Sequence, residues 1–342
     1  MKKVLKYGLS LAGVLALLLL CAGFYMLNYA LKPKELATRS HDVEGSYAYI
    51  YKEYPEVRLW IDSLQAAKAL QELYIENRQE ERLHALYIKA AQPTRHTAVI
   101  VHGYTDNAIR MLPIGYMYSR LLGYNILLPD LYAHGQSEGA AIQMGWLDRL
   151  DVLQWAAAAN QIFSYDQDST SMVIHGISMG AATTMMLAGE IEGKEQQYAY
   201  IKCFVEDCGY TSVWDEFCGE LHNQFHLPAF PLLDAASLLC RWKYGWDFQE
   251  ASPLRQVGRC TLPMFFIHGD ADTFVPTWMV YPLYQAKPMP KELWIVPGAE
   301  HAVAYRENKE TYTAKVKDFL EKYMEHDNEA TGMESQTTHN RP

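Results

Sequence analysis

A serine flanked by glycines marks the part of this sequence most suited to covalent chemistry. Residues 176–180, GISMG, follow the apolar run SMVIHG and precede the helix-prone run AATTMMLAGE. A G-x-S-x-G pentapeptide at a strand-to-helix junction is typical of a nucleophile elbow, a sharp turn that exposes the serine hydroxyl. The N–H groups and dipole of the following helix favour negative charge there. Ser178 is therefore the expected nucleophile.

The hydroxyl needs a base, because serine is a weak nucleophile on its own. The usual base is a histidine that a carboxylate orients, in the chain order serine, acid, histidine. Downstream, FFIHGDADTFVP places Asp270 and Asp272 after one apolar run, and WIVPGAEHA places His301 after the next. His301 is the expected base, and one aspartate of the pair is the expected acid. Asp207, at the end of CFVED, is the alternative acid.

Acyl transfer also needs backbone N–H donors that hold the oxyanion. The expected donors are Met179, directly after the nucleophile, and Tyr104 in the loop VIVHGYTDN. Gly103 allows that loop to approach the reacting carbonyl closely. Structural roles are expected for three further histidines near these motifs, namely His102, His134 and His175.

The elements that would position these residues alternate along the chain. Continuous apolar strands that alternate with helices predict an α/β fold with a mostly parallel sheet and helices on both faces. Residues 45–70 are expected to be helical, and residues 326–342 to form a polar, disordered tail. Seven runs have strand character: LHALYIKAA, TAVIVHGY, YNILLPD, SMVIHG, IKCFVEDCGY, LPMFFIHGD and ELWIVPGA.

One segment interrupts the alternation. Residues 211–250 contain no clear strand but eight aromatic residues, and so long an insertion in a compact domain is usually functional. A helical cap over the serine is expected, and the alternative is a structural insertion that packs on the sheet. Three tryptophans are the candidate substrate contacts in the cap: Trp214, Trp242 and Trp246.

The N-terminal segment has the character of a membrane anchor. Residues 7–31 contain no charged side chain, and about 20 apolar residues suffice to cross the hydrocarbon core as a helix. Lysines flank both ends, and the free amine favours an N-terminus inside and a catalytic domain outside the cytoplasm. The alternatives are a cleaved signal peptide, which would give a secreted protein, and a lipid anchor on Cys21.

These features predict a division into three parts. Residues 1–34 form the transmembrane anchor, residues 45–325 the catalytic domain, and residues 326–342 the tail. Deletion of the chain up to Lys34 is then expected to release a soluble, active enzyme.

Composition restricts the partners. The net charge is −10 and the basic residues are scattered, which argues against nucleic acid. No C-x-x-C or Cys/His cluster has zinc spacing, so no metal or organic cofactor is expected. Free thiols are expected, and the alternative is a disulfide among four cysteines: Cys203, Cys208, Cys218 and Cys240.

Together the motifs resemble the α/β-hydrolase superfamily, specifically its bacterial serine aminopeptidase/lysophospholipase-like hydrolases. The matching pieces are VHGYTDN, LLPDLYAHGQSEG, HGISMGAAT, FFIHGDADTFVP and GAEHA, within residues 85–320. The resemblance implies an eight-stranded sheet and a triad of Ser178, Asp272 and His301. Asp272 is favoured because the family places the acid three residues after the glycine, here Gly269. The absence of an HGGG run disfavours the lipase/esterase branch with that loop.

The expected activity is hydrolysis of a small-molecule acyl ester through an acyl-enzyme. An amide substrate, which would make the protein a peptidase or amidase, is the alternative. Three acidic residues in the cap are candidates to hold the ammonium group of such a substrate: Asp215, Glu216 and Glu220. A non-catalytic binding scaffold is the third reading, and the complete set of catalytic residues argues against it.

Overall fold

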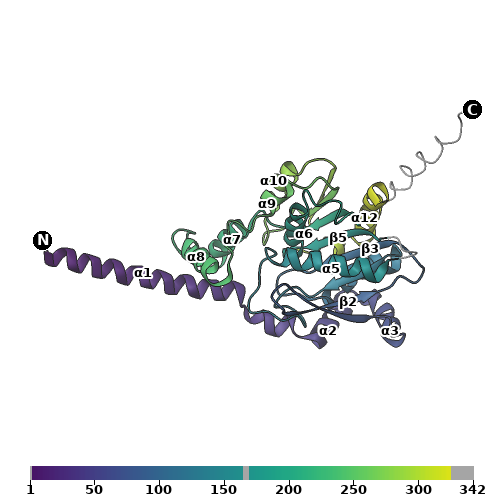
Figure 1. The fold of residues 1–342 in the computed structure, drawn as a ribbon, viewed down its shortest axis with the longest axis horizontal. Coiled ribbons are helices and arrows are strands. Elements are labelled where there is room, and N and C mark those ends of the chain that lie inside the picture. Colours follow the sequence, from purple (N-terminus) through teal and green to yellow (C-terminus); the bar gives the residue numbers. More distant parts are fainter. Residues whose placement is uncertain (1, 165–168, 325–342) are drawn as a thin grey trace, which may run out of the picture.

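The computed structural model describes residues 2–164 and 169–324, which are built around one eight-stranded sheet (Figure 1). The strands are β1 (Gln71–Glu76), β2 (Arg82–Ile88), β3 (His96–Val101), β4 (Asn125–Pro129), β5 (Ser171–Ile177), β6 (Ile201–Asp207), β7 (Met264–Gly269) and β8 (Lys291–Val296). Their order is β1-β2-β4-β3-β5-β6-β7-β8. β2 pairs antiparallel with β1 and β4, and the other pairs are parallel. The prediction of a mostly parallel α/β-hydrolase sheet is confirmed.

The seven strand-like runs of the sequence correspond to β2 through β8. β4 and β5 are buried along their whole length, as expected for strands with helices on both faces. β1 lies at the edge of the sheet and carries exposed or half-buried side chains, QELYIE. It was not predicted, because its sequence has glutamine and glutamate at three of six positions and no long apolar run.

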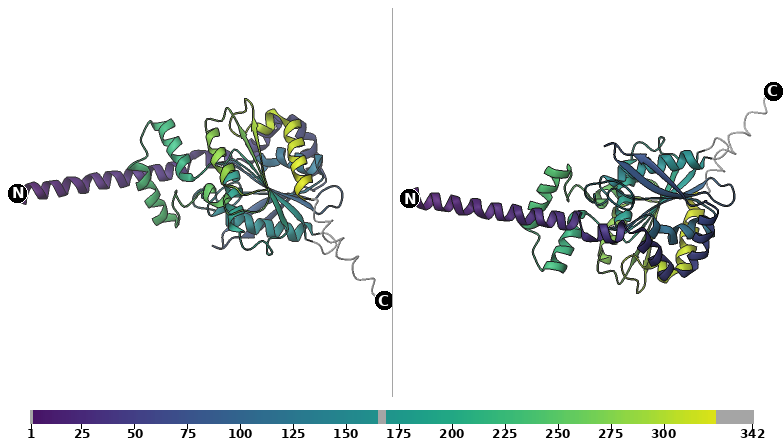
Figure 2. Two further views of the ribbon diagram at one scale, coloured as in Figure 1. Left: turned by 90° about the horizontal axis from the view of Figure 1, so that it is seen from above. Right: turned by 90° about the horizontal axis from the view of Figure 1, so that it is seen from below.

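Helices cover both faces of the sheet (Figures 1 and 2). One apolar core receives side chains from α5 (Asp148–Phe163), α6 (Met179–Glu190), α9 (Pro253–Val257) and α10 (Val280–Ala286). The other receives side chains from α2 (Val43–Glu53), α3 (Arg58–Ala66), α4 (Leu112–Tyr116), α11 (Ala304–Glu307) and α12 (Lys309–Met324). Short turns complete the described chain: η1 (Leu36–Ser40), η2 (Pro55–Val57), η3 (Ile109–Met111), η4 (Met117–Leu121) and η5 (Thr277–Met279). The expected helical segment 45–70 contains most of α2 and all of α3, and the predicted tail, 326–342, lies outside the described residues.

The insertion between β6 and β7 is helical, as expected. Its helices are α7 (Val213–Phe225) and α8 (Leu232–Tyr244). The Ser212 side chain accepts the N–H of Asp215 and so caps the start of α7, while Gly245 ends α8 with a φ of 80°. Ser212 therefore sets where α7 begins, and Gly245 sets where α8 ends.

The N-terminal helix α1 (Lys2–Leu31) projects from the molecule and joins it at its last turns (Figure 2). Among the described residues, Ser10–Ser40 contains a window with a mean hydropathy of 2.2, long and apolar enough to cross a membrane. Its outer part is exposed, with Leu15 and Leu18 showing 57% and 60% of their surface.

The inner end of α1 belongs to the domain. Leu27 and Leu31 are 1% and 0% exposed and share the core of α5 and α6. A Cβ at Gly23 would lie 3.0 Å from the Cβ of Ala235, so α1 and α8 pack closely. The expected boundary at residue 34 therefore cuts through the core. Deletion up to Lys34 would remove two buried leucines, which argues against the expectation of a soluble, active enzyme.

The six cysteines are free thiols. Cys203 and Cys208 lie in the core on one face of the sheet, whereas Cys240 lies in the core on the other face. The alternative of a disulfide among Cys203, Cys208, Cys218 and Cys240 is therefore contradicted.

Candidate active site

Ser178 occupies the turn between β5 and α6 in a strained backbone conformation. Its φ is 57° and its ψ is −120°, a combination that costs a non-glycine residue roughly 1–3 kcal/mol. The flanking glycines make the turn feasible. A Cβ at Gly176 would lie 2.0 Å from the carbonyl oxygen of Gly180, and a Cβ at Gly180 would lie 2.1 Å from that of Val101. The GISMG sequence therefore suits the sterics of a nucleophile elbow.

The structure brings Ser178, His301 and Asp272 into one line of hydrogen bonds. Oγ of Ser178 lies 2.8 Å from Nε2 of His301. Nδ1 of the same ring lies 2.7 Å from Oδ2 of Asp272. The imidazole is thus placed to take a proton from the hydroxyl while the carboxylate orients its other nitrogen.

Asp272 is held by its own loop and by a second histidine. Its Oδ1 accepts the N–H groups of Phe274 and Val275, each at 3.0 Å. Nε2 of the buried His268 lies 3.4 Å from its Oδ2. Burial alone would raise the pKa of the Asp272 carboxyl, but hydrogen bonds from His268 and His301 outweigh burial and lower that pKa. Asp272 is therefore an ionised acid at neutral pH.

Sequence reasoning did not identify His268, although HGDAD places it four residues before Asp272. Burial lowers the pKa of its imidazole, while the hydrogen bond with Asp272 and the charge of Glu206 raise it, and the net shift is upward. A histidine that ends a buried strand and precedes the acid was the signal available in the sequence.

The other two candidate acids point elsewhere. Asp270 accepts the N–H of Gly298 at 2.6 Å and so links the loops after β7 and β8. Asp207 accepts the hydroxyl of Tyr312 at 2.9 Å, and its backbone carbonyl accepts the N–H of Ser178 at 2.8 Å. Asp207 therefore stabilises the turn at Ser178 through its backbone carbonyl. Burial raises the pKa of its carboxyl to about 6.

Both expected oxyanion donors lie beside the serine. Met179 begins α6, and Tyr104 follows Gly103, where an added Cβ would lie 3.3 Å from the Cβ of Ser178. Within the described residues, the backbone N–H groups of Met179 and Tyr104 have no hydrogen-bond partner. Two unpaired N–H groups beside a serine hydroxyl suit a developing oxyanion.

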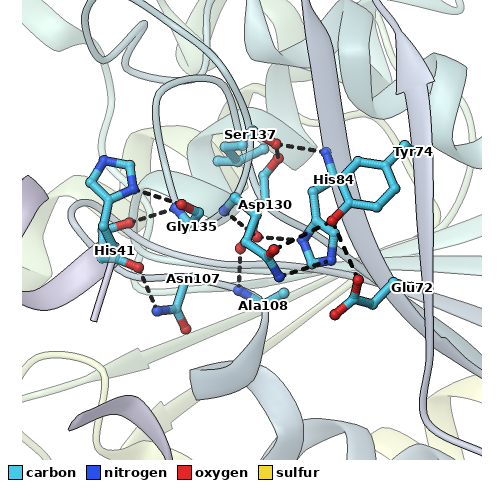
Figure 3. A network of polar contacts seen from close by, with 12 residues as sticks. His41, Glu72, Tyr74, His84, Asn107, Ala108, Asp130, Gly135 and Ser137 are labelled. Carbon is cyan, nitrogen blue, oxygen red and sulfur yellow. Dashed lines mark hydrogen bonds and ion pairs between the residues drawn. The ribbon is translucent and has the colours of Figure 1, made fainter. Parts of the chain in front are cut away.

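A buried network holds the loop that carries Tyr104 (Figure 3). Asp130, after β4, contacts Nδ1 of His84 at 2.6 Å through Oδ2. Its Oδ1 accepts the N–H of Ala108 at 2.7 Å. Asn107 donates to the carbonyl of Ser40, which follows α1 in the chain. The network therefore connects three segments: the turn after α1, the Tyr104 loop and the loop after β4.

The three histidines expected to be structural are buried and hydrogen-bonded away from Ser178. Nε2 of His102 accepts the N–H of Leu131, and Nε2 of His134 accepts the N–H of Thr105. His175 lies between the hydroxyls of Tyr118 and Tyr312, at 3.1 and 3.0 Å. Burial lowers the pKa of all three rings, that of His175 to about 3. They are neutral supports of the loops around the elbow.

A cavity of about 660 Å³ lies above the serine. Its lining includes Ser178, Met179 and Tyr104 from the hydrolase domain. The cap contributes aromatic rings, those of Phe217, Phe225 and Phe248, and the inner end of α1 contributes Tyr25, Met26 and Tyr29. Sequence analysis did not predict the contribution of α1, because the apolar character of the segment is explained by a membrane span alone.

The three candidate tryptophans lie away from this lining, within the described part of the chain. Trp242 is 80% exposed on the outer side of α8. Trp246 is 1% exposed and packs on Phe248, with ring centroids 5.9 Å apart, and Trp214 packs against the core. The helical periodicity of α8 directs Trp242 away from the cavity, which aromatic content alone did not reveal.

Of the three acidic cap residues, two line the cavity. Glu216 is 4% exposed and Glu220 is half-buried, and burial raises the pKa of both carboxyls. Asp215 instead accepts the hydroxyls of Thr211 and Ser212 at the start of α7. Its carboxylate is therefore occupied by the helix cap.

One group of the described residues has metal-ligand character. Ligand atoms of Cys208, Asp272 and His301 lie within 4.8 Å of one another. Burial raises the pKa of the Cys208 thiol well above its usual value, which disfavours the thiolate that a metal requires. Asp272 and His301 already contact each other.

The sheet, the elbow and the cap define a serine hydrolase of the α/β-hydrolase type. The model of the prolyl oligopeptidase family matches residues 141–327, more than half of the chain. The chain therefore belongs to the prolyl oligopeptidase family. The match contains Ser178, Asp272 and His301, whereas Tyr104 and α1 precede it.

Individual proteins are similar to this chain in sequence or in fold. The uncharacterized protein YqkD of Bacillus subtilis (strain 168) is 31% identical over 240 residues, which cover 69% of this chain and 74% of that protein. Esterase Pf2001 of Pyrococcus furiosus has the same fold, with a TM-score of 0.58, 22% identity and coverage of 75% and 93% of the two chains. Est1E of Butyrivibrio proteoclasticus, solved with ferulic acid, aligns with a TM-score of 0.53, 17% identity and coverage of 72% and 97%. The predicted resemblance to α/β-hydrolase serine hydrolases is confirmed.

Proposed function

We propose that the protein hydrolyses an acyl ester, with Ser178 as nucleophile, His301 as general base and acid, and Asp272 as the orienting carboxylate. The observation that carries the proposal is the continuous line of hydrogen bonds from Ser178 through His301 to Asp272 beneath an apolar cavity. An apolar cavity suits the acyl part of an ester, because it buries hydrocarbon without leaving polar groups unpaired.

In the proposed reaction, Oγ of Ser178 attacks the ester carbonyl carbon while Nε2 of His301 takes the hydroxyl proton. The N–H groups of Tyr104 and Met179 stabilise the oxyanion of the tetrahedral intermediate. His301 then gives the proton to the departing alcohol, which leaves the acyl group on Ser178. Water enters, loses a proton to His301 and attacks the acyl-enzyme, and the carboxylic acid is released with the serine hydroxyl restored.

Substitution of the nucleophile tests this proposal. Ser178→Ala in the full chain is expected to lower turnover of 4-nitrophenyl esters by several orders of magnitude and to abolish labelling by a fluorophosphonate probe. The chain should stay folded, because alanine is smaller than serine. Near-native turnover by this variant would refute the assignment of Ser178.

An amide substrate is the second candidate, favoured by the two cap carboxyls in the cavity and by the family to which the chain belongs. The substrate's ammonium group would pair with Glu216 or Glu220, restoring charge to carboxyls whose pKa is raised by burial. Parallel assays with 4-nitrophenyl esters and aminoacyl 4-nitroanilides distinguish the two. Faster nitroanilide turnover that falls on Glu216→Gln would establish the amide reading.

We also propose that α1 remains uncleaved as a single-pass anchor, with its N-terminus inside and the catalytic domain outside the cytoplasm. The burial of Leu27 and Leu31 supports an uncleaved helix, because cleavage after the apolar run would remove core side chains. Protease treatment of intact cells tests the orientation: the domain should be accessible from outside, and protection of the domain would reverse it.

A further inference from the structure

The inner end of the membrane helix is one wall of the catalytic cavity. Tyr25, Met26 and Tyr29 of α1 line the same cavity as Ser178, together with cap residues such as Phe217 and Leu221. A helix that only tethered the domain would not be expected to contribute to its catalytic cavity.

Specific contacts fix this wall in place. The hydroxyl of Tyr104 donates to the carbonyl oxygen of Ala30 at 2.6 Å, and the hydroxyl of Tyr29 donates to Oε1 of Gln224 on α7 at 2.8 Å. The N–H of Ile142 donates to the carbonyl oxygen of Leu31 at 2.9 Å. The helix is therefore bonded to both the cap and the Tyr104 loop.

The length of α1 places the cap at the bilayer surface. A helix rises 1.5 Å per residue, so about 20 residues cross the ~30 Å hydrocarbon core. Counted from residue 7, that core ends near Met26. Gly23, which contacts Ala235 of α8, is then within the edge of the bilayer, and the cap cannot lie far from the lipid (Figures 1 and 2).

The cap has the surface that this position requires. Trp242 and Leu238 of α8 are 80% and 62% exposed, and Phe230 and Leu227 of the preceding loop are 76% and 42% exposed. Lys243 of α8 lies over the ring of Phe24 on α1, with its Nζ 4.8 Å from the ring centroid. Exposed aromatic and aliphatic side chains beside a membrane helix are typical of a surface that enters the lipid interface.

We propose that the catalytic cavity opens onto the bilayer and that its substrate is a membrane-resident amphiphile, whose acyl chain lies between α1 and the cap helices while its ester carbonyl reaches Ser178. This inference rests on the proposed ester hydrolysis. The anchor is thus a positioning element of the site as well as a tether. A long acyl chain gains the apolar contact with Met26 and the cap that an acetyl group cannot make.

Chain-length selectivity tests the wall. The full-length protein is placed in phosphatidylcholine vesicles with 4-methylumbelliferyl palmitate in the lipid or 4-methylumbelliferyl acetate in solution. Met26→Trp narrows the cavity and should lower the ratio of palmitate to acetate turnover by about tenfold or more. Leu15→Trp, on the lipid-facing part of the same helix, is the matched control and should leave the ratio within about twofold.

The outcomes separate this inference from the proposed function. If the wild-type protein cleaves both esters and Met26→Trp does not change the ratio of palmitate to acetate turnover, the proposal that α1 lines the acyl site is refuted. The proposed ester hydrolysis then still stands. A wild-type protein that cleaves the acetate but not the palmitate also refutes the proposal that α1 lines the acyl site. A wild-type protein that cleaves neither ester and resists the fluorophosphonate probe refutes the proposed function itself. If Met26→Trp is not labelled by the probe, Met26→Ala decides: it should weaken selectivity for palmitate, and an unchanged ratio counts against the wall.

The depth of the cap is tested independently of catalysis. Tryptophan emission of the full chain is measured in vesicles of brominated phosphatidylcholine, which quenches only at contact, and α1 contributes no tryptophan of its own. Trp242→Phe should reduce the quenched fraction, whereas Trp60→Phe, on α3 at the far side of the domain, should not. Equal quenching in wild type and Trp242→Phe would show that α8 stays clear of the lipid and would overturn the proposed opening.

Discussion

The hydroxyl of Tyr104 donates a hydrogen bond to the carbonyl oxygen of Ala30 at 2.6 Å, and so joins the loop that carries the proposed oxyanion donor Tyr104 to the apolar helix α1. The two residues are 74 positions apart in the chain. The backbone N–H of Tyr104 lies beside Ser178, while its side chain reaches α1. The position of α1 is thus coupled to the geometry of the proposed oxyanion site.

Loss of that hydroxyl should therefore affect catalysis more than an ordinary tyrosine hydroxyl does. Tyr104→Phe keeps the backbone N–H and removes one hydrogen bond, for an expected cost of about 1 kcal/mol in the free energy of unfolding and a fall of about 3- to 10-fold in turnover. Tyr87→Phe is the control, because Tyr87 donates to Gln71 at 2.7 Å on strands remote from the site. Turnover and thermal unfolding are measured for both, and equal losses of turnover would contradict the coupling.

The two aspartates after β7 should differ sharply. Asp272→Asn leaves the shape of the loop but favours the wrong tautomer of His301, so turnover should fall by about 10⁴. Asp270→Asn retains an oxygen that accepts the N–H of Gly298, and its turnover should fall by less than about tenfold. Steady-state rates on one ester compare them, and the reverse order would identify Asp270 as the acid.

Glu206, buried at the end of β6, should make stability depend on pH. Burial raises the pKa of its carboxyl to about 8, against the opposing effects of the His268 charge and the Gly209 N–H. In the unfolded chain the pKa of a glutamate is about 4.3. Because the pKa of Glu206 is higher in the folded than in the unfolded chain, its contribution to the free energy of unfolding is complete below the unfolded pKa. That contribution is lost as the pH rises towards 8.

Glu206→Gln should remove this dependence while keeping an acceptor for Gly209. The melting temperature of the variant relative to wild type should therefore rise between pH 5 and pH 8. Glu300→Gln, at an exposed position, is the matched control. A constant difference across that range would show that Glu206 does not titrate between the folded and unfolded states.

Truncation should separate the two halves of α1. Removal of residues 2–19 takes away the exposed half and should leave fluorophosphonate labelling in detergent within about twofold. Removal of residues 2–34 also removes Leu27 and Leu31, each worth about 2–5 kcal/mol when buried, against a total stability of about 5–15 kcal/mol. The shorter chain should aggregate or lose labelling. Full labelling of both truncated chains would mean that the buried end of α1 is dispensable.

The sequence by itself determined the fold class and the residues for the chemistry. GISMG can be read without a structure because its glycines answer a local steric demand at one turn. Ser178, Asp272 and His301 each follow a strand that the sequence predicts. Parallel strands bring their carboxyl ends to one edge of the sheet, so the three residues were expected to lie together. Central strands such as β4 and β5 were recognised because burial on both faces requires continuous apolar runs, and the half-buried edge strand β8 was recognised because it carries the run LWIV.

Contacts between distant segments were decided by the tertiary structure alone. An apolar helix has the same composition whether lipid or protein covers it. The sequence of residues 7–31 therefore could not predict that Leu27 and Leu31 pack in the protein core. Likewise, the sequence could not show that the three candidate tryptophans of the cap lie away from the cavity lining, since that depends on how α7 and α8 pack against α1. His268 acquired its role only when β7 placed it against Asp272. In each case the position of a side chain depends on its packing against an element that is distant in the sequence. Composition and residue spacing do not identify that element.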